Sequence, residues 1–408
     1  MKLVMTMMVR DEADIVGAMI EHHLAQGIDF FIVTDNGSVD GTTEILQEFA
    51  EKGILELRHD PVHRKQQGET VTVMARDAYT VHGADWVLNA DADEFWIPVN
   101  DGLSLRDAFA AIDPAIQSFP VDVIDMIGAP ALAGTGLQRL TYRDYRSLDA
   151  LHSVGLISHS TYDSPHIGSA DVTVSQGNHF VSLDSRGTPP EGFEIEVLHF
   201  QWRSWEQFSR KVQNAGSAYE SQTGLVPSPN HHGMREYGRL KAGTLMASYV
   251  VRHPSVAELE AGLETGEYRS EGRIAAASAS TVPDVLFYTT EETRAPIELL
   301  LGSMAEVVKQ AAAEKIAEAE AARGREAELN ALTDVANNRI ADLEAALEVE
   351  LTNVRRWTGE LEVERVEHQA TRAAREALKT ELAELRDRRS VKFVNSLAEK
   401  AAKVTRKR

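Results

Sequence analysis

Short apolar runs alternate with segments of helical periodicity along the first hundred residues. Residues 3–9 are apolar except for Thr6, which predicts a buried strand, and the apolar positions of 13–26 recur as on one face of a helix. Further strands are expected at 30–34, 54–58 and 86–90, and further helices at 42–52 and 69–81. Repeated strand–helix pairs are typical of a Rossmann-like α/β fold, in which a mostly parallel sheet is flanked by helices.

The pattern changes twice after this first part. Residues 119–200 read as short β segments interrupted by His, Gly and Pro, and a helix is expected at 204–219. After Pro296 the chain has no proline and is rich in Ala, Glu, Arg and Leu, with apolar residues spaced by threes and fours from Leu329 to Leu361. Such spacing predicts a long C-terminal coiled coil, through which we expect the chain to form a homo-oligomer. The alternative is a single long solvated helix.

These shifts divide the chain into four expected parts. The first is the α/β domain, and the others are a small helical region, the coiled coil and a basic amphipathic tail. Their expected ranges are 1–215, 216–298, 299–388 and 389–408.

Charge is distributed unevenly along the 408 residues. The formal net charge is −21, yet the segment from Arg386 to Arg408 has a net charge of +7, which leaves −28 for the rest. An acidic body argues against nucleic acid as a partner. The basic end combines positive charge with an apolar helical side, which predicts contact with an anionic membrane surface. The alternative is a solvated helix end whose cations favour the helix dipole.

Composition narrows the chemistry and the location. The sequence has no cysteine, which excludes disulfides, thiolate metal sites and cysteine nucleophiles. It also lacks the roughly 18 consecutive apolar residues of a membrane span. We therefore expect a cytoplasmic protein that binds any metal through oxygen or imidazole, with its tail at the inner face of the membrane.

Two acidic segments follow predicted strands. Asp91 and Asp93 come directly after the strand at 86–90, and two carboxylates spaced this way can both face a hard cation that bridges phosphates. Asp35 and Asn36 open a tight turn after the strand at 30–34. Because ligands of parallel sheets bind at the carboxyl ends of the strands, the two segments together predict one nucleotide site.

Blocks of sequence in this order resemble glycosyltransferase family 2. The resemblance is strongest to the branch whose metal motif reads Asp-x-Asp-Glu-Phe, and it covers about half of the chain. The matching blocks are Met7 to Ile15, Glu21 to His23 with Gly27 to Asp29, Asp35 to Thr42, Trp86 to Phe95, and later Val197 to Lys211.

The resemblance implies a GT-A fold and an inverting transfer from a nucleotide-diphosphate sugar to an acceptor hydroxyl of a glycan or a lipid-linked molecule, in polysaccharide or cell-envelope assembly. It also implies a divalent cation, Mn²⁺ or Mg²⁺. The implied metal ligands are Asp93, Asp91 and His199, and the implied nucleotide-binding residues are Glu12, Asp35, Asn36, Arg76 and Asp91. This sequence has Asp11 where relatives commonly have Asn. Lys65 and Gln67 are further candidates for phosphate contact.

An inverting transfer needs a base that takes the proton of the acceptor hydroxyl. In the resembled family this residue comes from the segment downstream of the metal motif. His179 and Asp184 lie in that window, and Glu194 lies just beyond it. The sequence leaves the choice between them open.

Two other functions fit part of the pattern. A nucleotidyltransferase also places paired aspartates on an α/β sheet, but here Arg10-Asp11-Glu12 follows the first strand in place of a glycine-rich phosphate loop. A scaffold that kept the fold without catalysis would act through the coiled coil. Replacement of Asp93 by Ala separates an enzyme from such a scaffold.

Overall fold

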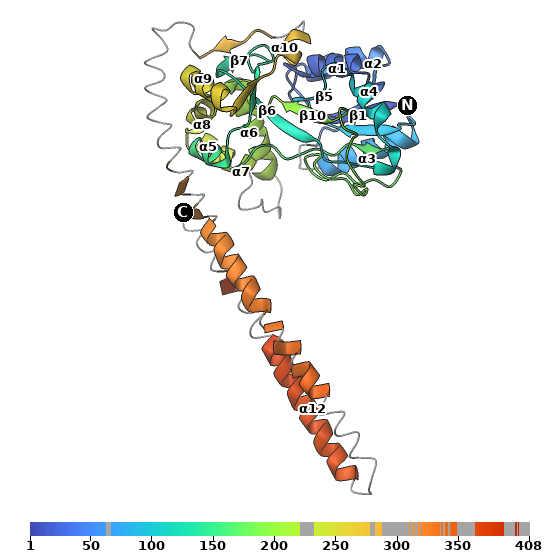
Figure 1. Cartoon of the computed structure of the whole chain (residues 1–408), viewed down its shortest axis with the longest axis vertical. Coiled ribbons are helices and arrows are strands. Elements are labelled where there is room, and N and C mark those ends of the chain that lie inside the picture. Colours follow the sequence, from blue (N-terminus) through green and yellow to red (C-terminus); the bar gives the residue numbers. More distant parts are fainter. Residues whose placement is uncertain are drawn as a thin grey trace. The chain divides into compact units, whose positions relative to one another are not determined.

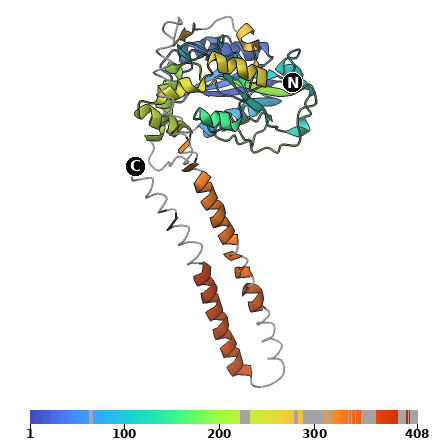
Figure 2. The same ribbon diagram turned by 60° about the vertical axis from the view of Figure 1, so that its left-hand side comes forward.

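The computed structural model has two compact units, Met1–Glu314 and Lys315–Arg408. Together they form the chain drawn in Figures 1 and 2. The structure describes residues 1–62, 67–220, 232–277, 282–287 and 364–386, several helical residues between 310 and 348, and residues 396, 397 and 399.

A five-stranded sheet forms the first half of the larger unit. Neighbouring strands β3, β2, β1 and β4 are parallel, whereas β9 joins the edge of β4 in the antiparallel direction. The strands, in spatial order, are β3 (Leu55–His59), β2 (Phe30–Asp35), β1 (Leu3–Val9), β4 (Trp86–Asn89) and β9 (His166–Ile167). The predicted parallel sheet is confirmed, with strand ends within one residue of those expected.

Helices cover both faces of this sheet, because successive strand residues point to opposite sides. Met5 and Phe31 belong to a core with α1 and α2, whereas Val4 and Ile32 pack with residues of α3. Figure 1 shows α1 and α2 on one side of β1 and α3 on the other. These helices and the next one are α1 (Val16–Ala25), α2 (Thr42–Glu51), α3 (Gln67–Thr80) and α4 (Leu105–Ala111).

A second five-stranded sheet lies beyond the loop 90–93. In it β10 is antiparallel to β5 and parallel to β6, while β8 pairs with β6 and β11. Its order is β11 (Tyr268–Ser270), β8 (Tyr142–Asp144), β6 (Asp122–Ile127), β10 (Ile195–His199) and β5 (Glu94–Pro98). The chain passes from β4 to β5 through Asp91 and Asp93, so this motif joins the two sheets.

Helices of the second half pack around α6. A core that includes Trp202, Phe208 and Tyr249 joins them to β8 and β11. The remaining elements are η1 (Pro114–Ile116), α5 (Leu148–Ser153), α6 (Trp205–Glu220), α7 (His232–Lys241), α8 (Leu245–Arg252), α9 (Val256–Thr265), α10 (Arg273–Ala277), β7 (Ala131–Ala133) and β12 (Val285–Leu286). Because β11 pairs with β8, the segment expected as a helical appendage shares a sheet with the preceding part.

The smaller unit is helical where the structure describes it, and it includes α12 (Glu364–Arg386). The partly buried positions between 329 and 347 recur at intervals of four and three residues, which is a heptad spacing. Thr333 occupies this seam, and the neighbouring Leu332, expected in the seam, is 55% exposed. Leu382 of α12 is buried. The described residues therefore have heptad spacing, while the coiled coil itself and assembly between copies of the chain stay predictions.

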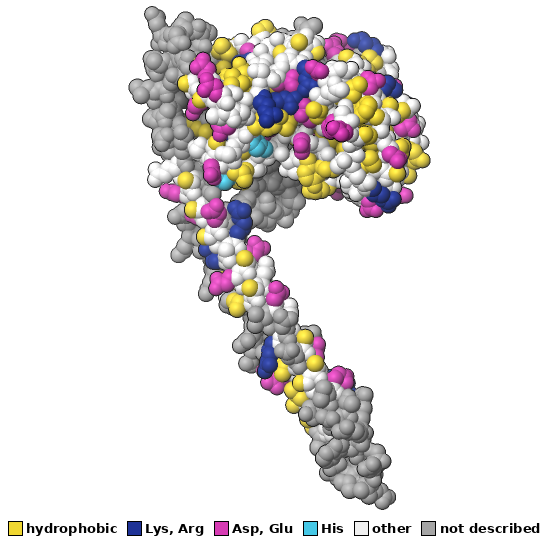
Figure 3. All heavy atoms as spheres, viewed as in Figure 1, with side chains coloured by type: hydrophobic (Ala, Val, Ile, Leu, Met, Phe, Trp, Pro, Cys, Tyr) yellow, Lys and Arg dark blue, Asp and Glu magenta, His cyan; other side chains and the backbone are white. Residues whose placement is uncertain are grey.

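Acidic side chains are scattered over the visible face of both units (Figure 3). The basic tail predicted at 389–408 lies outside the described residues, apart from 396, 397 and 399. Among the helices that the structure describes, none combines the length and the apolar composition needed to cross a membrane.

Candidate active site

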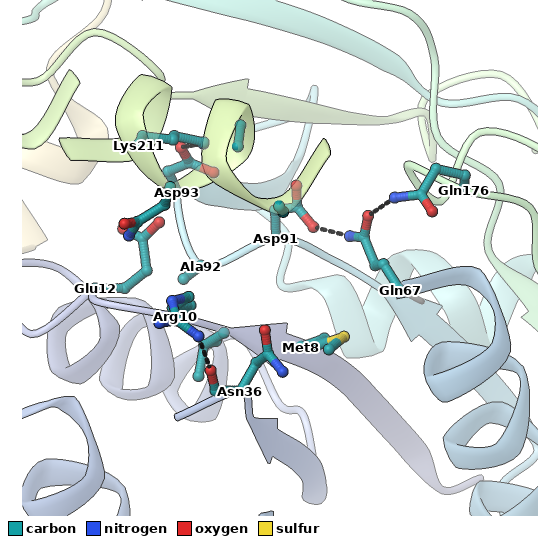
Figure 4. Close-up of a pocket in the computed structure, with 14 residues that line it drawn as sticks. Met8, Arg10, Glu12, Asn36, Gln67, Asp91, Ala92, Asp93, Gln176 and Lys211 are labelled. Atoms are coloured by element: carbon teal, nitrogen blue, oxygen red, sulfur yellow. Dashed lines mark hydrogen bonds and ion pairs between the residues drawn. The ribbon is translucent and has the colours of Figure 1, made fainter. Parts of the chain in front are cut away.

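A pocket of about 250 Å³ opens at the carboxyl ends of β1, β2 and β4. Met8 and Arg10 reach it from the end of β1, Asn36 follows β2, and Asp91 and Asp93 follow β4. This position is where parallel sheets bind ligands. Figure 4 shows Asp93, Glu12 and Lys211 on one side of the pocket and Asp91, Gln67 and Gln176 on the other.

Asp93 is surrounded by cations. Its Oδ2 is 2.7 Å from Lys211 Nζ and 3.4 Å from a guanidinium nitrogen of Arg203, and its Oδ1 is 3.7 Å from His199 Nε2. Burial alone would raise the pKa of Asp93, but Lys211, His199 and Arg203 together hold that pKa well below its ordinary value. Asp93 is therefore an ionised carboxylate although it is only 1% exposed.

Arg203 joins this cluster to the loop after β1. Its guanidinium is fully buried and pairs with Glu12 and with Asp14, the latter at 2.8 Å. Burial raises the pKa of Glu12 to about 7, against the opposing charge of Arg203. One arginine thus fixes three carboxylates from two loops, Asp93 included, and this network sets the shape of the pocket wall.

His199, at the end of β10, connects Asp93 to a second buried carboxylate. Its Nδ1 is 3.4 Å from Asp125 Oδ1 and 3.0 Å from the hydroxyl of Ser160. Burial opposes protonation, yet the Asp125 and Asp93 carboxylates raise the pKa of His199 well above its ordinary value. The ring is therefore positively charged in this arrangement and bridges two carboxylates.

Asp91 is held by neutral donors. Gln67 and Asn178 donate side-chain amide hydrogens to its Oδ1, over 2.9 and 3.2 Å, and Gln176 donates to Gln67 over 2.6 Å. The three linked side chains Gln176, Gln67 and Asp91 form a hydrogen-bonded row in Figure 4. Burial, and then the charge of Asp93, raises the pKa of Asp91.

The side chain of Asp35 stabilises the turn that follows β2. The hydroxyl and the backbone N–H of Ser38 donate to Asp35 Oδ1 over 2.6 and 3.0 Å, and Asp35 does not line the pocket. Asn36 does line it, while its amide donates to the carbonyl of Asp60 and its own carbonyl accepts from Arg10. Of the two predicted nucleotide contacts in this turn, only Asn36 borders the cavity.

A histidine pair on α1 fixes the strand that follows the acidic motif. The backbone N–H of Trp96 donates to His23 Nε2, and His22 Nε2 donates to the Trp96 carbonyl, both over 3.0 Å. Both rings contact the ring of Phe95. Because β5 begins one residue after Asp93, these bonds also help to fix the position of Asp91 and Asp93. The sequence singled out this pair without assigning it this contact.

Other predicted site residues lie outside the pocket lining. Arg76 donates to the Val172 carbonyl over 2.7 Å and thereby holds the chain at 172–173. Asp184 is 74% exposed and pairs with Arg186. Glu194 is exposed as well, and Lys65 lies outside the described residues. Gln67, a lesser candidate, does line the pocket.

His179 sits beside the acidic motif without lining the cavity. It directly follows Asn178, whose amide bonds Asp91, and its Nδ1 is 3.4 Å from Asp163 Oδ1. Sequence reasoning missed Asp163, and it quoted Arg203 and Lys211 only as part of a resembling block. No local pattern marks Arg203 and Lys211, because their shared partner Asp93 lies more than 100 positions away in the chain.

One buried carboxylate oxygen of Asp93 is a candidate ligand for a divalent cation. Among the described residues, no three His, Asp or Glu side chains are grouped as a metal site. Asp93 Oδ1, however, is buried, has no hydrogen-bond partner among those residues, and faces His199 Nε2. Mg²⁺ and Mn²⁺ often take one or two protein ligands and complete their shell with water and phosphate oxygens. Asp91 is already bonded by amides.

Comparison with known proteins gives one family match. Residues 4–119 match the model of glycosyltransferase family 92, a range that begins in β1 and includes Asp91 and Asp93. The predicted enzyme class, glycosyltransferase, is confirmed for residues 4–119, which include most of the residues that line the pocket. The matching model is that of family 92, whereas the sequence blocks resemble family 2. No curated protein matches this sequence.

Solved structures of S. aureus TarS are also similar. A crystal structure of TarS 1-349 in complex with UDP-GlcNAc has 12% identity and a TM-score of 0.30, with 78% of this chain and 92% of that chain covered. Another TarS crystal structure has 13% identity and a TM-score of 0.29, with 64% and 45% covered. This chain therefore spans less than half of the TarS chain in the latter structure.

Proposed function

We propose that this protein is a metal-dependent, inverting glycosyltransferase that uses a nucleotide-diphosphate sugar. The observation that supports it most is the ionised Asp93 beside Lys211, in a pocket at the strand ends of a segment that matches a glycosyltransferase family. A nucleoside diphosphate leaving group develops negative charge, which such a site is suited to stabilise.

Cationic side chains would receive the diphosphate. Lys211 Nζ and Arg10 both line the pocket, and the Lys211 side chain is 44% exposed, so it can turn toward a ligand. Asp93 and His199 would hold Mn²⁺ or Mg²⁺, with Asp91 close by. When bound, the cation would neutralise charge on the diphosphate. Because His199 carries a proton in this arrangement, cation binding would release that proton.

The acceptor side would lie at His179. In a single displacement, the acceptor oxygen forms a bond to the anomeric carbon while the bond from that carbon to the diphosphate oxygen breaks. The hydroxyl proton passes to a base, and the diphosphate leaves with the bonding electron pair. His179 is the better candidate for this base because its neighbour Asn178 bonds Asp91, whereas Asp184 is exposed and paired with Arg186.

A turnover assay tests this function. The full chain with Mn²⁺ would be incubated with a set of UDP- and GDP-sugars, and release of the free nucleotide would be measured. Release with one donor, lost in Asp93→Asn and retained in Asp184→Asn, supports the proposal. No release with any donor in the presence of an acceptor extract would favour a scaffold that works through its helical unit.

The proposal also includes self-association of the chain and contact of its basic tail with the membrane, both of which depend on the C-terminal part. The heptad spacing between residues 329 and 347 supports self-association. Glycan or lipid-linked acceptors at a membrane would suit a cytoplasmic enzyme whose basic tail contacts anionic lipid. Sedimentation of the full chain, with and without anionic vesicles, measures both properties.

A further inference from the structure

An exposed aromatic side chain lies beside the Asp91 end of the pocket. Phe180 is 54% exposed, and its ring lies 5.3 Å from that of Tyr162 at an angle of 79°. Edge-to-face geometry of this kind is favourable for an aromatic pair. Tyr162 thus supports one edge of the Phe180 ring while much of the ring stays open to solvent.

The backbone around Phe180 is fixed by hydrogen bonds. Its N–H donates to the hydroxyl of Ser175 over 3.0 Å, and its carbonyl accepts from the backbone N–H of Ser175 over 2.9 Å. Ser164 donates its hydroxyl to the His179 carbonyl over 2.7 Å. These bonds keep the exposed ring in place, so it is a preorganised surface.

His179 supplies a polar group next to this ring. Its Nδ1 faces the fully buried carboxylate of Asp163 at 3.4 Å and the Tyr162 carbonyl at 3.1 Å, which leaves Nε2 for another partner. Gly177 makes room for that atom, because a Cβ at this position would lie 2.7 Å from Nε2. Burial raises the pKa of Asp163 to about 7.

The same segment is tied to the donor pocket. Asn178 donates to Asp91 and Gln176 donates to Gln67, so His179 and Phe180 continue directly from residues that build the pocket wall. The carboxyl groups near them, Asp91 and Asp163, disfavour a phosphate group as the occupant. A neutral, hydroxyl-rich molecule avoids this repulsion.

We propose that Phe180, Tyr162 and His179 form an acceptor subsite for a pyranose ring of a glycan. The C–H face of the sugar lies on Phe180, and one hydroxyl donates a hydrogen bond to His179 Nε2. Aromatic surfaces with a few convergent polar groups are typical of small-ligand sites. This inference rests on the proposed function and assigns the acceptor class to it.

Binding of the full chain to an immobilised panel of neutral oligosaccharides tests the subsite, with UDP and Mn²⁺ present throughout. The variants are Phe180→Ala, the conservative Phe180→Trp, and Tyr79→Ala as a control at another exposed aromatic, on α3. We expect the wild type to bind at least one oligosaccharide, Phe180→Ala to weaken that binding about tenfold or more, and Phe180→Trp to restore it. Tyr79→Ala should bind as the wild type does.

Titration with UDP separates the two proposals. If every variant binds UDP but no oligosaccharide is bound, or if Phe180→Ala binds oligosaccharide as well as the wild type, the subsite is wrong and the proposed function stands. Binding of anionic phospholipid vesicles through Phe180 in place of glycans would also overturn it. If the wild type binds neither UDP nor GDP, the proposed function fails and the subsite fails with it.

Discussion

The two aspartates of the acidic motif, two residues apart, have opposite surroundings. Asp93 contacts Lys211, Arg203 and His199, and these charges lower its pKa. Asp91 accepts from the neutral amides of Gln67 and Asn178, and burial raises its pKa. The sequence presents both as one motif, but the structure gives them different electrostatic surroundings.

This difference indicates which side of the pocket is suited to bind a charged group. A carboxylate that stays ionised at 1% exposure must be compensated by its neighbours, and of those around Asp93, Lys211 also lines the cavity. Asp91 instead belongs to a hydrogen-bonded row that continues toward His179. We therefore assign the diphosphate and its cation to the Asp93 side and the acceptor to the Asp91 side.

Replacement of Asp93 by Asn has the largest expected effect. The substitution removes the carboxylate charge with little change of shape and leaves Lys211, Arg203 and His199 without their common partner. We expect turnover to fall about 10²–10³-fold, which is the usual effect of losing one group that stabilises charge in the transition state. Turnover assays measure it, with circular dichroism as the check on folding. Asp184→Asn is the matched control. Turnover within threefold of wild type in Asp93→Asn would contradict the assignment.

Replacement of Lys211 by Met should weaken nucleotide binding about 10- to 100-fold, because one charge-assisted contact to phosphate is lost. Lys211→Arg should retain part of the affinity. Calorimetric titration with UDP or GDP gives the dissociation constants, and Lys52→Met, on the exposed end of α2, serves as the control. Equal affinity in Lys211→Met and the wild type would remove Lys211 from the diphosphate site.

Replacement of Asp91 by Asn should have a smaller effect, because the side-chain amide keeps an acceptor oxygen at the position to which Gln67 and Asn178 both donate. We expect turnover to fall about tenfold, because the two hydrogen bonds lose the charge of the carboxylate but remain in place. The same assay, run beside Asp93→Asn, measures the ratio of the two losses. Losses of equal size would mean that the two carboxylates act as one unit.

Acid should weaken the fold at the histidine pair behind the motif. Burial lowers the pKa of His22 to about 4, below its ordinary 6.5, so the unfolded chain binds this proton more readily. The contribution of His22 is complete above pH 6.5 and is lost as the pH falls toward 4, by about 3 kcal/mol in all. Urea unfolding at pH 7.5 and pH 4.5 measures it. His22→Gln should lose less stability between these values, and an unchanged loss would contradict this role.

Local patterns predicted the parallel sheet well. The run 3–9 became β1 with the same bounds, and the expected strand at 86–90 ended one residue earlier, because apolar runs and turn residues act over short distances. The helix expected from 13 begins at Val16, since the loop after β1 is used by Asp11 and Glu12 to bond the turn at 38–42. The helix begins three residues later than expected because this loop forms part of the site.

The chemistry was only partly visible in the sequence. Asp91, Asp93 and Asn36 were found because they follow predicted strands at the sheet edge, whereas Glu12 was named through the family resemblance and Gln67 only as a further candidate. Asp35 and Arg76 have the expected residue types, but their side chains bond the turn and a neighbouring segment. Arg203 acts through pairing with Asp93, 110 positions away, which tertiary structure alone determines.

Calorimetric titration with UDP and GDP, each with and without Mn²⁺, tests the central claim most directly. The wild type and Asp93→Asn would be compared as full chains. We expect that one nucleotide binds the wild type, that Mn²⁺ strengthens this binding, and that the metal-dependent gain disappears in Asp93→Asn. Binding that is the same in both proteins, or no binding by the wild type, would contradict the assignment of Asp93 to a nucleotide-diphosphate site.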